Sequence, residues 1–242
     1  MLILVIGDVC EDHHYMGVFD RKNPESDAPL MKQTNLRVSL GMAANVANNL
    51  QAFCSVVFEG PPPPHSRKSR YYADDGVTQL LRVDVDAKAL PYAVRERAYY
   101  ERFDAVVISD YAKGFITADV IRDIIARFDG PIFVDTKLTN LKPLSGPIYK
   151  INSAERLRLM SEPDELVVTC GAGGCWYKDE NFPAPVVDAV DVCGAGDTFL
   201  AALAHEFTKT GDMPSALMAA NHYAALACTR PGVYALKKGD LQ

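Results

Sequence analysis

Short apolar runs alternate with longer amphipathic or polar segments along most of this chain. Runs of this length predict buried strands at 2–6, 54–58, 104–109, 131–135, 147–151 and 165–169, and a hairpin near 173–177. The segments around them predict helices at 43–53, 87–102, 117–128, 195–209 and 212–229, and another beginning at Ser153. Apolar strands that alternate with helices predict an α/β fold with a mostly parallel sheet covered by helices on both faces.

Three stretches depart from this rhythm. Residues 9–40 are polar and predict irregular chain with short extended pieces at 29–32 and 35–40. Four consecutive prolines at 61–64 predict an extended connector without helix. Residues 71–86 alternate in polarity, with Leu81, Val83 and Val85 on one side, which predicts a half-exposed strand.

Composition excludes several classes of function. The 25 basic and 31 acidic residues give a net charge of −6 and form no basic stripe, which argues against nucleic acid or an anionic membrane as partner. No apolar run reaches the length of a membrane span, and the run at 2–6 is too short for a signal sequence. The six cysteines form no C-x-x-C pair, so we expect free thiols, a cytoplasmic protein and no zinc site.

The segment 191–199 carries the most informative chemistry. Gly194 and Gly196 flank Ala195, Asp197 follows, and a long apolar run then begins. This pattern predicts a tight turn into a helix, where converging backbone N–H groups and the helix dipole attract an anion. A carboxylate beside such a site suits a base that takes the proton of a hydroxyl attacking a phosphoryl group. The alternative is a turn and helix cap with no catalytic role.

Polar residues follow the predicted strands where each one ends. They are Asp8, Ser109 and Asp110, the run 135–137, Asn152 and Thr169. In open parallel sheets, ligands bind at the carboxyl ends of the strands, so we expect these side chains to share one site.

Six short motifs occur in one order over nearly the whole chain. They are 7–12, 41–47, 109–114, 152–155, 168–174 and 191–198, with Arg21, Pro24, Glu25 and Pro29 between the first two. Together they resemble the motifs of the ribokinase-like (PfkB) carbohydrate kinases. The sequence Ser-Asp-Tyr-Ala-Lys-Gly at 109–114 is most similar to the heptose-7-phosphate kinase domain of ADP-heptose synthesis, which makes a lipopolysaccharide precursor.

The resemblance implies one ribokinase-like domain over 1–242, with three α/β/α layers and a small β lid built from about 9–40 and 66–86. It also implies ATP- and Mg²⁺-dependent transfer of the γ-phosphoryl group to a sugar hydroxyl, with a heptose 7-phosphate or a related sugar as acceptor. A small-molecule sugar is then the partner, and a homodimer through the lid is expected.

The resemblance further implies a role for individual residues. Asp197 would be the base, and the N–H groups of Gly194, Ala195 and Gly196 would form the anion hole. The sugar site would contain Asp12, Gly41, Asn45, Arg21 and Lys113. The nucleotide site would contain Lys137, Asn152, Thr169, Gly171 and Gly174. Asn152 and Glu155 would hold Mg²⁺ through water, or would alternatively cap the helix that follows.

Two departures from the family pattern concern the sugar side. Met42 replaces a glycine that lets the backbone approach the sugar, and the four prolines stand where the family has a further strand and helix, so we expect a shorter sheet at one edge. Two alternatives therefore stay open. One is a kinase for another small sugar or a nucleoside, and the other is a catalytically weak protein that binds sugar or nucleotide.

Overall fold

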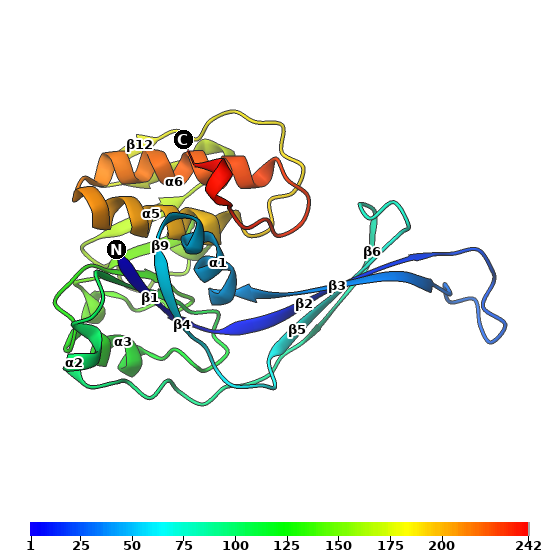
Figure 1. The fold of residues 1–242 in the computed structure, drawn as a ribbon, viewed down its shortest axis with the longest axis horizontal. Coiled ribbons are helices and arrows are strands. Elements are labelled where there is room, and N and C mark those ends of the chain that lie inside the picture. Colours follow the sequence, from blue (N-terminus) through cyan, green and yellow to red (C-terminus); the bar gives the residue numbers. More distant parts are fainter. Residues whose placement is uncertain (242) are drawn as a thin grey trace.

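The computed structural model describes residues 1–241 and is built around an eight-stranded sheet (Figure 1). Its strands lie in the order β12–β11–β10–β9–β8–β7–β1–β4. Their bounds are β1 Leu2–Gly7, β4 Ser55–Glu59, β7 Ala105–Ser109, β8 Ile132–Asp135, β9 Ile148–Asn152, β10 Leu166–Thr169, β11 Cys175–Tyr177 and β12 Glu180–Phe182. All pairs are parallel except the two that involve β11 and β12, so the predicted mostly parallel sheet is confirmed.

Helices cover both faces of this sheet. Their bounds are α1 Ala43–Phe53, α2 Arg97–Tyr100, α3 Ala118–Ile125, α4 Ser153–Arg156, α5 Ala195–Thr210 and α6 Met213–Cys228, with 3₁₀ turns at Lys142–Leu144, Gly171–Gly173 and Lys238–Asp240. Alternate residues of β1 enter two separate cores: Ile3 and Val5 pack with α1, α5 and α6, whereas Leu4 and Ile6 pack with α2 and α3. The three-layer α/β/α fold follows from this alternation.

A second, four-stranded sheet extends away from the layered body (Figure 1). Its order is β3–β2–β5–β6, with bounds β2 Val9–Val18, β3 Lys32–Met42, β5 Ser66–Tyr72 and β6 Gln79–Val85. The prediction of irregular chain was therefore wrong over 9–18, which form β2, whereas the extended piece expected at 35–40 lies within β3 and the segment 19–31 is irregular as predicted. Polar side chains on both faces of β2 leave no alternation from which a strand could be recognised. The strand expected near 71–86 is present as β6, but both of its faces are exposed, whereas one exposed face was predicted.

Two predicted helices are shorter than expected. Only α2 forms within 87–102, because Pro91 lacks an N–H group and disfavours helical geometry at the residue before it. The helix expected over 117–128 ends at Ile125. In residues 1–241 no helix combines the length and the apolar character that crossing a membrane requires.

Candidate active site

Asp197 joins three separate segments at the carboxyl end of the sheet. It lies in the first turn of α5, directly after Gly194, which adopts a left-handed conformation with φ of 83°. The Nδ2 of Asn45 on α1 donates a hydrogen bond to Asp197 Oδ2 at 2.8 Å. The hydroxyl of Tyr111, from the loop after β7, donates to Asp197 Oδ1 at 2.7 Å. The carboxylate is thus held by one donor from each side.

The environment of Asp197 makes it a stronger base than an exposed aspartate. Burial raises its pKa, and the hydrogen bonds from Asn45 and Tyr111 oppose the shift only in part. Burial and the charge of Asp197 also raise the pKa of Tyr111, so its hydroxyl stays protonated as a donor. A buried, oriented carboxylate is well suited to accept a proton near neutral pH.

Asp8 holds the loop that carries Tyr111. Its Oδ2 accepts the N–H groups of Tyr111 at 2.8 Å and Lys113 at 3.2 Å, and its Oδ1 accepts that of Phe115 at 3.3 Å. Asp110 closes the same loop by accepting the N–H of Ala112 at 2.7 Å. These strand-end acids, predicted to lie near one site, position its donors.

Lys150 is a residue that the sequence analysis missed. It lies on β9, is buried, and its Nζ is 2.6 Å from Asp135 Oδ2. A Cβ added to Gly196 would lie 2.9 Å from this Nζ, so the amine sits directly beside the first turn of α5. A lysine within an otherwise apolar strand was the available signal, since lysine is rarely buried without a partner.

The turn before α5 is partly occupied by its own hydrogen bonds. The N–H of Ala195, one of three predicted anion-hole donors, bonds to Val192 O at 3.3 Å. Positive potential at this point therefore comes from the helix terminus together with Lys150.

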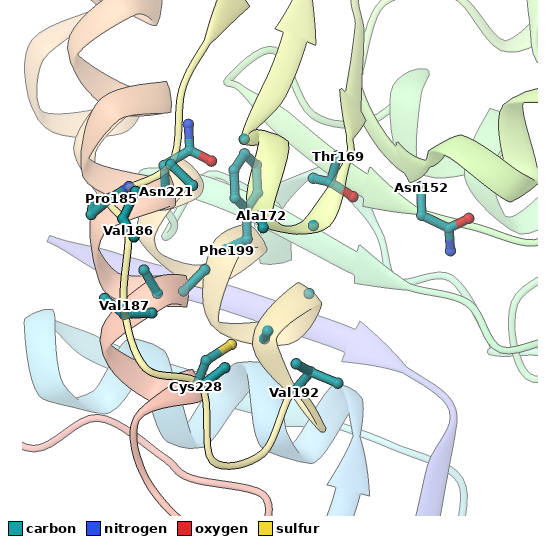
Figure 2. Close-up of a pocket in the computed structure, with 18 of the residues that line it drawn as sticks. Asn152, Thr169, Ala172, Pro185, Val186, Val187, Val192, Phe199, Asn221 and Cys228 are labelled. Atoms are coloured by element: carbon teal, nitrogen blue, oxygen red, sulfur yellow. The ribbon is translucent and has the colours of Figure 1, made fainter.

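A cavity of about 500 Å³ opens beside the same turn (Figure 2). Four of the five predicted nucleotide-binding residues line it: Asn152, Thr169, Gly171 and Gly174. Its other walls are largely apolar and come from the segment 184–192, α5 and α6, including Pro185, Val187, Phe199 and Ala225. An apolar slot that ends at a helix N-terminus suits a flat base attached to phosphates.

Lys137, the fifth predicted nucleotide residue, lies outside this cavity. Its amine forms an ion pair with Glu155 and lies 5.1 Å from the centre of the Tyr111 ring. Asn152 and Glu155 form a capping box at the start of α4, each accepting the backbone N–H of the other at 2.9 Å. The capping alternative is therefore realised in the structure.

The described residues, 1–241, contain no group of three or more His, Cys, Asp or Glu side chains placed to hold a metal. Two buried oxygens of the described chain nevertheless have no hydrogen-bond partner, Ser109 Oγ and Asp135 Oδ1. Burial opposes the ionisation of Glu155, but hydrogen bonds from Asn152 and Lys137 hold its pKa below the usual range. Ionised carboxylates with a free oxygen suit Mg²⁺ bound through its water shell.

The predicted sugar residues are only partly brought together. Asp12 on β2 is 3% exposed, and its Oδ1 lies 2.5 Å from Nη1 of Arg70. A Cβ at Gly41 would lie 2.1 Å from Asp12 Oδ2, so only glycine leaves room for this carboxylate. Lys113 forms an ion pair with Asp86 at 2.5 Å.

Arg21 is the one predicted sugar residue that lies far from the others. It is exposed in the segment 19–31, at the outer end of β2. A ten-residue strand spans about 33 Å. The structure therefore does not bring Arg21 to the site in this chain.

Met42 occupies a backbone conformation that normally requires glycine. Its φ of 60° and ψ of −130° lie in a region that side chains strongly disfavour, and its side chain is buried. This backbone conformation explains why the family pattern has a glycine at this position.

Comparison with known proteins supports the family. The model of the pfkB family carbohydrate kinases matches residues 150–238, a range that contains Lys150, most of the cavity and α5. This part of the chain is similar to the pfkB family carbohydrate kinases. The chain is 28% identical over 305 positions to the bifunctional protein HldE of Nitrobacter hamburgensis, covering 99% of this chain and 62% of that protein. It is 29% identical over 287 positions to HldE of Nitratiruptor sp., covering 95% and 62%.

The chain spans about 62% of the length of the curated relatives it matches. The 305 aligned positions exceed its 242 residues, which fits the expected shortening. A putative ribokinase from Agrobacterium tumefaciens superposes with a TM-score of 0.74 at 17% identity, over 99% of this chain and 95% of that one. A ribokinase from Arabidopsis thaliana complexed with ribose and ATP gives 0.70 at 16%, over 96% and 93%. The ribokinase-like fold is confirmed.

Proposed function

We propose that the protein is an ATP- and Mg²⁺-dependent sugar kinase acting on a heptose 7-phosphate or a related sugar phosphate, as in the making of a lipopolysaccharide precursor. The observation that carries this proposal is the buried Asp197, placed between the first turn of α5 and its two donors, Asn45 and Tyr111. The six free thiols and the need for ATP suit the cytoplasm.

The acceptor hydroxyl would approach Asp197 from the side of the second sheet. Asp197 takes the hydroxyl proton, the hydroxyl oxygen bonds to the γ-phosphorus, and ADP leaves. Lys150 and the N-terminus of α5 stabilise the negative charge on the transferred group. Asn45 and Tyr111 keep the carboxylate in one orientation throughout.

ATP would lie with its base in the apolar cavity and its phosphates at Thr169, Gly171 and the first turn of α5. Glu155 and Asp135 are the carboxylates that would hold Mg²⁺ through water, with Asn152 beside them. When bound, the ion neutralises phosphate charge. Lys137, paired with Glu155, adds a positive charge on the side of Tyr111.

We assign the second sheet as the lid of one kinase domain. One face of it carries six exposed apolar side chains: Leu36, Val38, Leu40, Leu81, Val83 and Val85. The strand register places these on the same face, because Tyr15 lies opposite Leu36 and Tyr71 opposite Leu81, while Tyr15 and Tyr71 are themselves paired. An apolar face of this extent fits a homodimer through the lid.

One observation favours the second candidate, a kinase for another sugar or a nucleoside. Met42 stands where the family pattern has a glycine, and its buried side chain lies at the start of α1, three positions before Asn45. The third alternative is a binding protein with weak catalysis, and the assay described next distinguishes it from the two kinases.

The test is an ADP-release assay with ATP and Mg²⁺ against heptose 7-phosphate, fructose 6-phosphate, fructose, ribose and adenosine. Asp197→Asn serves as the blank. Turnover on the sugar phosphates that vanishes in the variant supports the proposal. Turnover only on an unphosphorylated sugar or on adenosine selects the second candidate, and binding without turnover selects the third.

A further inference from the structure

The inner face of the lid, which lies opposite its apolar face, carries a row of basic side chains. His14 on β2 is directly opposite Arg37 on β3 and Arg70 on β5, and Arg70 is directly opposite Arg82 on β6. Residues opposite one another in adjacent strands share a face, and like charges so placed destabilise a sheet. Such a row therefore calls for negative charge in front of it.

The chain supplies only part of that negative charge. Asp12 pairs with Arg70 at 2.5 Å, and Asp84 pairs with Arg82 at 2.7 Å. Lys68, in the neighbouring row, and Arg37 form no ion pair within residues 1–241. Four cationic side chains thus face two carboxylates, which leaves an excess of positive charge on this face.

Arg70 is built to receive a further anion. It is 7% exposed, yet only its Nη1 makes a hydrogen bond within the described chain, to Asp12. Its Nε and Nη2 have no hydrogen-bond partner in the described chain and are not fully enclosed, so a ligand can reach them. A guanidinium fixed at one nitrogen presents its remaining N–H groups in a rigid fork that matches phosphate or carboxylate oxygens.

The inner face of the lid lies beside the proposed base. Lys68 Nζ is 5.7 Å from the centre of the ring of Tyr111, whose hydroxyl donates to Asp197 at 2.7 Å. Lys68 and Arg70 lie two positions apart on β5 and therefore share this face. An acceptor lying between the lid and Asp197 would therefore place its far end at this row.

Both carboxylate oxygens of Asp12 are engaged within the lid. Its Oδ1 is taken by Arg70, and its Oδ2 accepts the thiol of Cys10 at 3.6 Å and lies against Gly41. Its position fixes Arg70. The sugar-binding role expected for Asp12 from the family pattern stays a prediction.

We propose that Arg70, with Arg82 and Arg37 beside it, forms the subsite for an anionic group, a phosphate or a carboxylate, on the acceptor, and that Asp12 is the positioning residue for Arg70. This inference rests on the proposed kinase function and names the class of acceptor. The other source of the same chemistry is the γ-phosphate of ATP, and the test separates the two.

The first experiment compares Arg70→Gln with wild type on a matched pair, fructose 6-phosphate and fructose, with ATP varied separately. A charge-assisted hydrogen bond to phosphate is worth enough that KM for the phosphorylated acceptor should rise about 10- to 100-fold. KM for fructose and for ATP should stay within about 2-fold. Arg122→Gln, exposed on α3, is the matched control and should change nothing.

Arg82→Gln and Arg37→Gln keep the test open if Arg70→Gln folds poorly, because both side chains are exposed. Each should raise KM for fructose 6-phosphate several-fold and leave fructose unchanged. Equal effects on the two sugars would overturn the assignment. A rise in KM for ATP alone would assign the row to the γ-phosphate instead.

The positioning role is tested by a double-mutant cycle with Asp12→Asn. If Asp12 acts through Arg70, the double variant should be no worse on fructose 6-phosphate than Arg70→Gln alone, and kcat should change less than KM. Additive losses, with fructose affected as strongly, would show that Asp12 binds hydroxyls itself.

A wild-type protein without turnover would remove the proposed function but not decide the subsite. Calorimetric titration with fructose 6-phosphate, with inorganic phosphate as competitor, answers that question separately. Tighter binding of fructose 6-phosphate than of fructose, lost in Arg70→Gln, would uphold the subsite. Equal binding in both proteins would reject it.

Discussion

The amide of Asn45 donates to the carboxylate of Asp197 across 152 positions of sequence, at 2.8 Å. The bond ties α1, at the root of the lid, to the helix that carries the proposed base. The same carboxylate receives Tyr111 on its other oxygen. The three residues form one unit, so the proposed chemistry depends on the packing of α1 against α5.

Replacing the proposed base should abolish transfer without removing the nucleotide site. We expect Asp197→Asn to lower kcat by about 10²- to 10⁴-fold, the usual share of a general base, because an amide cannot accept the proton. ATP affinity, measured by calorimetry, should change less than about 3-fold. A variant that retains wild-type kcat would remove Asp197 from the mechanism.

The same variant should gain stability at neutral pH. The folded-state pKa of Asp197 is raised by burial, so the folded protein holds this proton at pH values where the unfolded chain has lost it. The group therefore favours folding below its unfolded pKa, and this contribution is lost as pH rises through the folded pKa. Asp197→Asn should melt at a higher temperature than wild type at pH 7, with the difference shrinking as pH is lowered toward 4. No gain at pH 7 would contradict the burial argument.

Removing the buried amine should affect both rate and stability. Lys150→Met leaves Asp135 buried without its partner and should cost roughly 3–5 kcal/mol in the free energy of unfolding. It should also lower kcat about 10²- to 10³-fold through lost stabilisation of the transferred group. Adding Asp135→Asn to this variant should restore much of the stability and none of the rate. Recovery of the rate would mean that Lys150 acts only as a structural partner.

The backbone strain at Met42 can be measured by comparing the stability of two variants, Met42→Gly and Met42→Ala. Alanine and glycine both remove the side chain, but only glycine adopts φ of 60° and ψ of −130° without strain. Met42→Gly should therefore be more stable than Met42→Ala by about 1–3 kcal/mol in urea unfolding. If Met42→Ala were instead the more stable of the two variants, the backbone would have to relax at this position.

The apolar face of the lid should control the oligomeric state. Val38 is 51% exposed on this face, and Val38→Asp would place a charge in any interface built there. Sedimentation velocity should show a dimer for wild type and a monomer for the variant. Leu90→Asp, at a site that is 86% exposed in the segment before α2, is the control and should remain dimeric. A wild-type monomer would contradict the dimer.

Local patterns predicted the layered body well. The helix predicted over 43–53 has the same first and last residues as α1. The pattern of Gly194 and Asp197 correctly predicted the start of α5. The lid strand β2 was missed because polar side chains on both of its faces, such as Asp12 and His13, leave no alternation in the sequence. Pairs such as Lys150 with Asp135 and Arg70 with Asp12 arise from register between strands, which a single sequence does not display.

The anchoring of the chain at Asp8 also bears on how this protein can diversify. Its carboxylate fixes the loop of Tyr111, and its backbone oxygen accepts the N–H of Ala43 at the start of α1. Both donors to Asp197 are thus set from one point at the end of β1, inside the body. Under the proposed mechanism, substitutions along the lid can therefore alter which acceptor is recognised while the geometry around Asp197 stays unchanged.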